Sequence, residues 1–314
     1  MSSKRQQRTK ALLLLLDDPD AGVFEIVEKE LLNENTGIVP DLEALWESAP
    51  DEACQIRIEN LIRRIRFKEN FRKWRNWSKQ PAPDLLEGFI LASQYHYPDL
   101  NIDKVHRKIE EIRKRVWVEI NNSFTSLEKI TVLNHILFND YNFSISPGNV
   151  VSPKNCFINN ILETGAGNPV SIALLYNIIA QKLGMPVRFI DLPRTPLLGY
   201  IDHRIAAKVH PPGVISDVLF YINPANKGSI SGRRELEFVM KKMNFDLKSV
   251  CFEASSPQRF LLRLLEETGK LYELNGQAEK TALRPRIQDR PEGASFCRHH
   301  NHGVRRRLLP QVFL

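Results

Sequence analysis

The apolar stretch over residues 170–183 constrains the fold more than any other segment. It follows Gly165-Ala166-Gly167-Asn168-Pro169 and stops at Gly184, with Pro186 just beyond. Glycine after a last helical turn, with proline soon after it, is a helix-stop signal. Apolar residues occupy nearly every face of this segment, namely Ile172, Ala173, Leu174, Leu175, Ile178, Ile179 and Ala180. A helix that is apolar all round is buried, so the sequence predicts a core built around it.

The residue pattern changes after this helix. Short strand-like runs occur at 187–190, 197–201, 205–209 and 218–222. Helical patterns occur at 84–96, 102–120, 126–138 and 157–163 before the helix, and at 233–243 and 260–275 after the strands. Helices followed by strands favour an α+β domain with an antiparallel sheet over a doubly wound sheet.

The residue pattern over 1–80 predicts helices and no strands. Asp18-Pro19-Asp20 is typical of a helix start, with a capping Asp and Pro at the first helical position. Pro50-Asp51-Glu52 repeats this pattern 31 residues later. Cys54, Ile58 and Ile62 then recur at the spacing of Val23, Val27 and Leu31. Two helical hairpins at this period predict a HEAT-like region.

These patterns divide the chain into four parts. We expect the HEAT-like region over 1–80, the α+β domain over 81–245, a C-terminal helical segment over 246–283 and a basic, disordered tail over 284–314. The tail contributes +5 of the net charge of +7. The rest of the chain is therefore almost neutral, which makes nucleic acid an improbable partner in spite of a basic stretch over 57–79. A salt-sensitive nucleic-acid face on that stretch is kept as a minor alternative.

The cysteines and apolar runs exclude several classes of protein. Four scattered cysteines without a CxxC pair argue against a disulfide framework and against a zinc site. The Cys297–His302 cluster lies in the tail, where ordering a metal site would cost entropy. The apolar run over 11–16 is too short to span a membrane. We expect a cytoplasmic protein with no metal, no cofactor and no membrane association.

Several motifs resemble a known family. The segments 155–163, 167–176 and 184–187, followed by Phe220-Tyr221-Ile222-Asn223-Pro224-Ala225-Asn226-Lys227-Gly228, are similar to the SirB-type, bacterial branch of the transglutaminase-like superfamily. The resemblance extends over about residues 10 to 283. It implies a papain-like domain in which a Cys begins the buried helix, a His follows on a strand, and an Asp orients that His.

The three positions that would carry this chemistry hold other residues. Pro169 stands where the resemblance implies the nucleophile, Thr195 where it implies the base, and Asn223 where it implies the orienting carboxylate. Covalent catalysis needs a thiolate with a base in reach. The sequence therefore predicts a non-catalytic protein that binds a protein or peptide, with Gly167, Asn168, Pro169 and Asn223 shaping the cleft.

One catalytic alternative stays open. Cys156 lies ahead of the buried helix, and His203 lies beyond the next two strands. If the fold brought these two side chains together, the protein would be a divergent cysteine hydrolase or acyltransferase.

Overall fold

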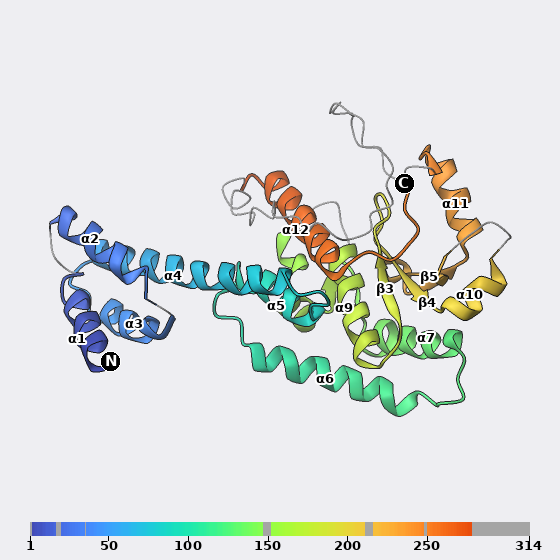
Figure 1. The fold of residues 1–314 in the computed structure, drawn as a ribbon, viewed down its shortest axis with the longest axis horizontal. Coiled ribbons are helices and arrows are strands. Elements are labelled where there is room, and N and C mark those ends of the chain that lie inside the picture. Colours follow the sequence, from blue (N-terminus) through green and yellow to red (C-terminus); the bar gives the residue numbers. More distant parts are fainter. Residues whose placement is uncertain are drawn as a thin grey trace.

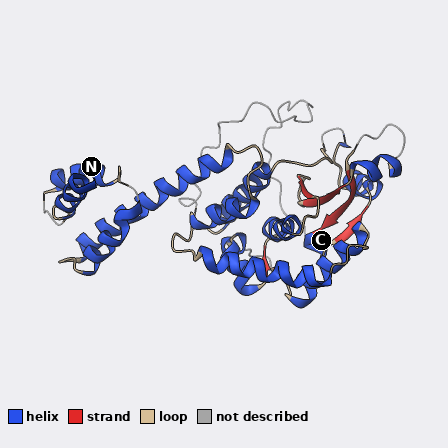
Figure 2. Cartoon of the chain, turned by 60° about the horizontal axis from the view of Figure 1, so that its bottom comes forward, coloured by secondary structure: helices blue, strands red, loops and turns tan. Residues whose placement is uncertain are grey.

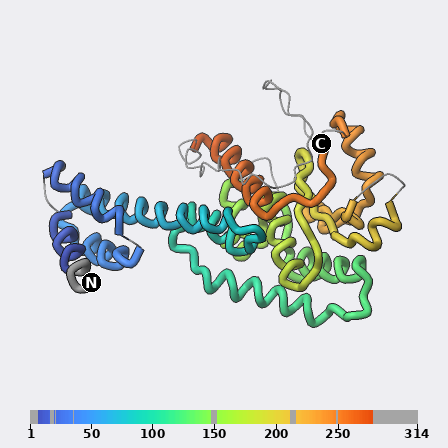
Figure 3. The backbone as a smooth tube through the Cα atoms, in the orientation of Figure 1, coloured from blue at the N-terminus to red at the C-terminus, as the bar shows by residue number. Residues whose placement is uncertain are grey.

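The N-terminal helices extend away from a larger mixed body in a computed structural model of the chain (Figure 1). The structure describes residues 2–16, 20–34, 36–146, 152–210, 216–247 and 250–277. The N-terminal helices are α1 (Ser2–Leu13), α2 (Ala21–Leu31), α3 (Val39–Glu47) and α4 (Glu52–Ser78), with a short η1 (Thr36–Ile38) before α3. Figure 3 shows the chain passing from these helices into the body through α4.

The N-terminal helices have a core of their own. Leu31, Leu42, Ile58 and Leu61 are among its most buried members. The caps follow the predicted chemistry, because Asp51 accepts a hydrogen bond of 2.7 Å from the backbone N–H of Cys54. At α2 the predicted position was wrong: Asp20, not Asp18, is the capping residue, and it accepts from the N–H of Gly22 at 2.7 Å. Asp18 itself lies outside the described residues.

The end of α4 packs tightly on the first helix of the body, α5 (Leu85–Gln94). Trp77 is almost fully buried, and its indole N–H donates to the carbonyl of Asp84 at 2.7 Å. A Cβ atom on Gly88 would lie 2.4 Å from the Trp77 ring, so only glycine permits this approach. The chain turns between the two helices over residues 79–84.

The body is built around α9 (Pro169–Lys182), as the sequence predicted. Residues 170–180 of this helix are buried without interruption. It contacts α5, α6 (Ile102–Glu119), α8 (Ile158–Thr164) and α12 (Pro257–Leu274). The remaining helix of this group, α7 (Ser126–His135), starts with a capping box between Thr125 and Glu128 and continues into a π-helical turn, η2 (Ile136–Asp140).

An antiparallel sheet packs beside α9. Its strands are β3 (Val187–Ile190), β4 (Leu197–Ile201), β5 (Val218–Asn223) and β6 (Ser229–Ser231), in that spatial order. Figure 2 shows these strands on the side of the body away from the N-terminal helices. Two very short strands, β1 (Ser144–Ile145) and β2 (Ala166–Gly167), form a separate parallel pair. The predicted strands at 187–190, 197–201 and 218–222 are confirmed.

One predicted strand is a helix. Residues 205–209 belong to α10 (His203–Val209), which Asp202 caps by accepting from the N–H of Ile205 at 3.0 Å. Ile205 and Val209 are exposed, and Ala206 is the buried residue of α10. The β-branched residues therefore lie on the outer face of a helix, whereas the strand prediction had placed them in a sheet.

The C-terminal elements complete the body. Helix α11 (Arg233–Lys242) follows β6, and α12 contacts both α5 and α9. Phe260 of α12 stacks on Phe189 of β3 with ring centroids 3.9 Å apart. The backbone N–H of Ser255 also donates to the carbonyl of Phe189 at 2.7 Å, which covers the outer edge of β3. Within the described residues, no helix combines the length and apolarity needed to cross a bilayer.

Candidate functional site

The first turn of α9 is held by a closed set of hydrogen bonds. Asn168 is the N-cap, and its side-chain oxygen accepts from the N–H of Ser171 at 2.7 Å. The Ser171 hydroxyl donates to the carbonyl of Asn155 at 2.7 Å, and the N–H of Asn168 donates to the same carbonyl at 3.0 Å. Pro169 occupies the first helical position, where the missing N–H removes no helical bond. The helix start is therefore complete without a reactive side chain at residue 169.

Cys156 lies inside this network. It ends the short helix η3 (Pro153–Cys156) and is fully buried. The side-chain amide of Asn168 donates to its sulfur at 2.9 Å. Burial raises the pKa of the Cys156 thiol to about 12. A buried thiol with a raised pKa is a packing residue and not an activated nucleophile.

The positions of Thr195 and Asn223 meet at one end of the sheet. Leu197 pairs with Ile190, and Leu198 pairs with Ile222, so the β3–β4 turn and the end of β5 lie side by side. That Pro169, at the start of α9, lies beside these two residues stays a prediction.

The side chain of Asn223 forms its hydrogen bond within its own turn. Its side-chain oxygen accepts from the N–H of Ala225 at 3.1 Å, which caps the 3-10 turn η4 (Pro224–Asn226). An Asx turn of this kind fixes the backbone locally.

A partly buried hydrogen-bonded link near this turn was not foreseen from the sequence. Asn134 of α7 donates to the carbonyl of Gly228 at 2.8 Å and accepts from the hydroxyl of Tyr176 at 2.8 Å. Three elements, α7, α9 and the β5–β6 turn, are thereby joined at one side chain. The residues are far apart in sequence and belong to no recognisable motif, so no sequence signal could have identified them.

The structure does not bring the alternative catalytic pair together. His203 begins α10, where its side chain is 82% exposed and its Nδ1 lies 2.5 Å from Asp217. Asp217 raises the pKa of His203 through this hydrogen bond and through its charge. Cys156 is buried in the core, and neither residue is among the contacts of the other.

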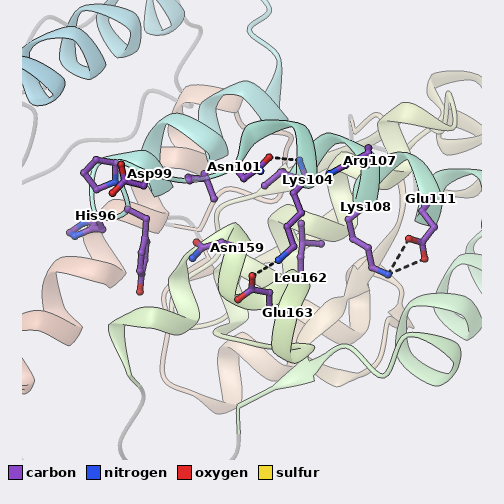
Figure 4. Close-up of a pocket in the computed structure, with 14 residues that line it drawn as sticks. His96, Asp99, Asn101, Lys104, Arg107, Lys108, Glu111, Asn159, Leu162 and Glu163 are labelled. Carbon is purple, nitrogen blue, oxygen red and sulfur yellow. Dashed lines mark hydrogen bonds and ion pairs between the residues drawn. The ribbon is translucent and has the colours of Figure 1, made fainter. Parts of the chain in front are cut away.

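A groove of about 890 Å³ lies elsewhere on the body, between the loop after α5, the first half of α6, and α8 (Figure 4). Its lining comes from the loop residues 96–101, from Lys104, Val105, Arg107, Lys108 and Glu111 of α6, and from Asn159, Leu162 and Glu163 of α8. Gly167, Asn168, Pro169 and Asn223 do not line it. A role for these four residues in a cleft stays a prediction.

Four of the nine cations in the basic stretch over 57–79 are paired with carboxylates. Its ion pairs join Arg63 to Glu59, Arg64 to Glu28, Arg66 to Glu43 and Asp99, and Arg72 to Glu69. Cations that are already paired release few counterions on binding a phosphate backbone. The four pairs therefore reduce the charge that this stretch could offer to a phosphate backbone, and a nucleic-acid face here stays a prediction. In the described part of the chain, no cluster of His, Cys, Asp and Glu could hold a metal ion, and residues 297–302 lie outside that part.

These features define the class of protein. A profile of the transglutaminase-like superfamily matches residues 103–266, which is more than half of the chain, so the chain belongs to this superfamily. The match begins in α6 and ends in α12, and it includes α9 and the whole sheet.

The curated relatives of the chain are distant. A UPF0162 protein of Xylella fastidiosa is 24% identical over 109 residues, which are 35% of this chain and 39% of that protein. A UPF0162 protein of Buchnera aphidicola is 26% identical over 157 residues, 50% of this chain and 54% of that protein. Human F-box only protein 21 is 24% identical over 177 residues, 49% of this chain and 27% of that protein. The chain thus spans about a quarter to a half of the length of these curated relatives. No solved structure matches the chain.

Proposed function

We propose that this chain is a non-catalytic, SirB-type member of the transglutaminase-like superfamily that acts by binding a protein or peptide. The observation that carries the proposal is Pro169 at the first position of α9. In this fold a nucleophile would stand at that place, where the helix dipole lowers the pKa of a thiol. Proline supplies no thiol or hydroxyl, and its ring fits the helix start without strain.

The nearest thiol does not replace the missing nucleophile. The sulfur of Cys156 is buried, bonded to Asn168, and has a raised pKa. At neutral pH its thiolate is scarce, so covalent attack through it would be slow. The proposal keeps the helical N-terminal region, with its HEAT-like hairpins, as a second surface for partner binding.

The proposal is tested first by thiol reactivity. Native protein is alkylated with iodoacetamide from pH 5 to 9, and each Cys is followed by mass spectrometry. Cys156 should stay unmodified until the protein is unfolded. In parallel, a panel of amide and ester substrates is assayed with the wild type and with Cys156→Ala. Turnover by the wild type that Cys156→Ala abolishes would show that the protein is an enzyme and refute the proposal.

A restored triad tests the assignment of the empty positions. The variant Pro169→Cys, Thr195→His, Asn223→Asp should acquire a thiol with a reaction midpoint below the ordinary pKa of about 8.5. Pro169→Cys alone is the matched control, because it has the helix start but no base. If the triple variant and the single variant titrate alike, the three positions do not form the site that the resemblance implies.

A further inference from the structure

The long helix α4 is covered on opposite sides in its two halves. Over the first half, Ile58 and Ile65 are buried in the core of the N-terminal helices. Over the second half, Trp74 and Trp77 are buried in the core of the body. Ile65 and Trp74 are about two and a half helical turns apart, so their side chains leave α4 in opposite directions. The side of α4 that packs on the N-terminal helices is therefore not the side that packs on the body.

That first side continues beyond Ile65 as a row of cations. Its members follow one another at intervals of three or four residues, which places them on one face of the helix, and all are exposed: Lys68, Arg72, Arg75 and Lys79. We call these four residues the basic face. Three of them line a cavity of about 420 Å³ together with Phe71, which is 39% exposed. Arg72 pairs with Glu69, whereas Arg75 and Lys79 form no ion pair with any residue that the structure describes.

Charge is divided sharply along this part of the chain. Residues 2–59 contain thirteen Asp and Glu against six Lys and Arg, a net charge of −7, whereas residues 60–79 carry a net charge of +7. Arg66, near the boundary, pairs with Glu43 of α3. Arg75 lies roughly 14 Å further along the same continuous helix. The acidic helices leave Arg75 and Lys79 of their own chain unpaired, so these cations are free for the acidic helices of a second copy.

The outer side of α3 supplies the matching surface. This helix buries Leu42 and exposes Asp41 and Glu47, and neither carboxylate forms an ion pair within the described part of the chain. Trp46, beside Glu47, is 41% exposed, and Leu14, which lines a small cavity with residues of α3, is 75% exposed. We call Asp41, Glu47, Trp46 and Leu14 the acidic surface. Exposed tryptophan next to free charge is typical of an interface.

The two surfaces suit a pair of copies related by a two-fold axis. The N-terminal helices project from the same side of α4 as the basic face, and Figure 1 shows α4 as the rod between them and the body. Two copies laid antiparallel would thus place each acidic surface on the basic face of the other. From Lys68 to Lys79 the basic face is roughly 16 Å long, which is enough for one helix of about 10–12 Å diameter to lie across it. Two identical contacts close the assembly and prevent open-ended growth.

We propose that the chain forms an antiparallel, two-fold symmetric dimer in which the acidic surface of each copy binds the basic face of the other. Asp41 and Glu47 pair with Arg75 and Lys79 of the second copy, and Trp46 packs beside its Phe71. A second copy fits better than a nucleic acid or an anionic membrane, because it supplies both signs of charge, whereas a phosphate surface would be repelled by the acidic helices. The inference does not depend on the proposed function.

The test measures the mass of the full chain in solution by sedimentation across a wide range of protein concentration. The wild type should be a dimer at low salt and should dissociate as salt rises, because salt screens the contacts between exposed charges. An acid-reversed variant carries Asp41→Lys with Glu47→Lys, and a base-reversed variant carries Arg75→Glu with Lys79→Glu. Each variant alone should raise the Kd of the dimer at least about tenfold, because like charges then meet at both contacts.

Mixing the two variants gives the decisive result. An equimolar mixture should dimerise again, because the reversed acidic surface of one variant meets the reversed basic face of the other, and the second contact keeps its native charges. A chain with all four substitutions should also dimerise with itself. The matched control is Arg204→Glu with Lys208→Glu, which reverses two exposed cations at the same spacing on α10 and should change the Kd less than about twofold. Urea unfolding checks that every variant is folded.

Three results would overturn the inference. The first is a wild type that stays monomeric at low salt and high concentration. The second is a dimer that one or both folded charge-reversed variants leave unchanged. The third is a mixture of the two variants that does not dimerise. Nucleic acid that binds the monomer through Arg75 and Lys79 would accompany the first result and would assign the basic face to a phosphate backbone instead.

Discussion

Replacing Gly228 by alanine should destabilise the body of the protein by far more than the change in backbone preference. Gly228 has φ +73°, and a Cβ atom there would lie 2.0 Å from the side-chain oxygen of Asn134. A non-glycine residue in this left-handed region costs about 1–2 kcal/mol. Asn134 must also move, which breaks its bonds to Tyr176 and Gly228, and each such bond contributes about 1 kcal/mol. We expect a total loss of about 3–4 kcal/mol in urea unfolding, the sum of these contributions.

Gly184 offers a matched control. Its φ is also +73°, but a Cβ atom there would meet nothing within 4 Å. Gly184→Ala should therefore lose only the backbone contribution of about 1–2 kcal/mol. In an Asn134→Ala background, Gly228→Ala should lose no more than Gly184→Ala, because the obstructing side chain is gone. If Gly228→Ala and Gly184→Ala destabilise the wild type equally, the link through Asn134 does not hold the strand-end turn as described.

Three further perturbations test the helix starts and the exposed histidine. Asn168→Ala removes both the cap of α9 and the hydrogen bond to Cys156, and it should lower the free energy of unfolding in urea by about 2 kcal/mol. Asn168→Ser should recover part of this loss, because serine is also a good N-cap. Equal losses in the two variants would contradict the capping role. Thr125→Ala should lower the free energy of unfolding by about 1 kcal/mol through loss of the capping box, and Thr125→Ser should restore it. In NMR titration, His203 should show a pKa above the ordinary value of about 6.5, because Asp217 favours the charged ring. The stability that this pair contributes is present at low pH and is lost as pH rises through the pKa of His203; an unchanged titration in Asp217→Asn would refute the pairing.

The helices and three of the strands could be predicted because local signals defined them. Gly184 and Pro186 marked the end of the buried helix, and residues 187–190 and 197–201 match β3 and β4 residue for residue. The strand prediction failed at 205–209, where composition favoured a strand but the Asp202 cap started a helix. The short strands β1, β2 and β6 were missed, because two or three residues carry no detectable alternation.

For the candidate site, too, local sequence signals support some predictions, whereas contacts between distant segments could not be predicted. Local motifs place Pro169, Thr195 and Asn223 at the catalytic positions that the resemblance implies, and that assignment stays a prediction. The groove could not be predicted in this way, because it needs α8 to face α6. The spacing of Lys104, Arg107, Lys108 and Glu111 marks one face of α6, yet nothing in the sequence shows that Glu163 would lie opposite. The same holds for Asn134, whose partners are separated from it by 42 and 94 residues.

On the proposed function, the way α9 begins explains how the fold persists without catalysis. Asn168 and Ser171 satisfy the backbone of the first turn, and Asn155 anchors both of them. None of these bonds uses the side chain of residue 169, so replacing a nucleophile there by proline removes chemistry and no structural bond. At the other end of the arrangement, Asn223 retains the capping role that an aspartate could also fill. Selection for a stable body would therefore not oppose the loss of catalysis.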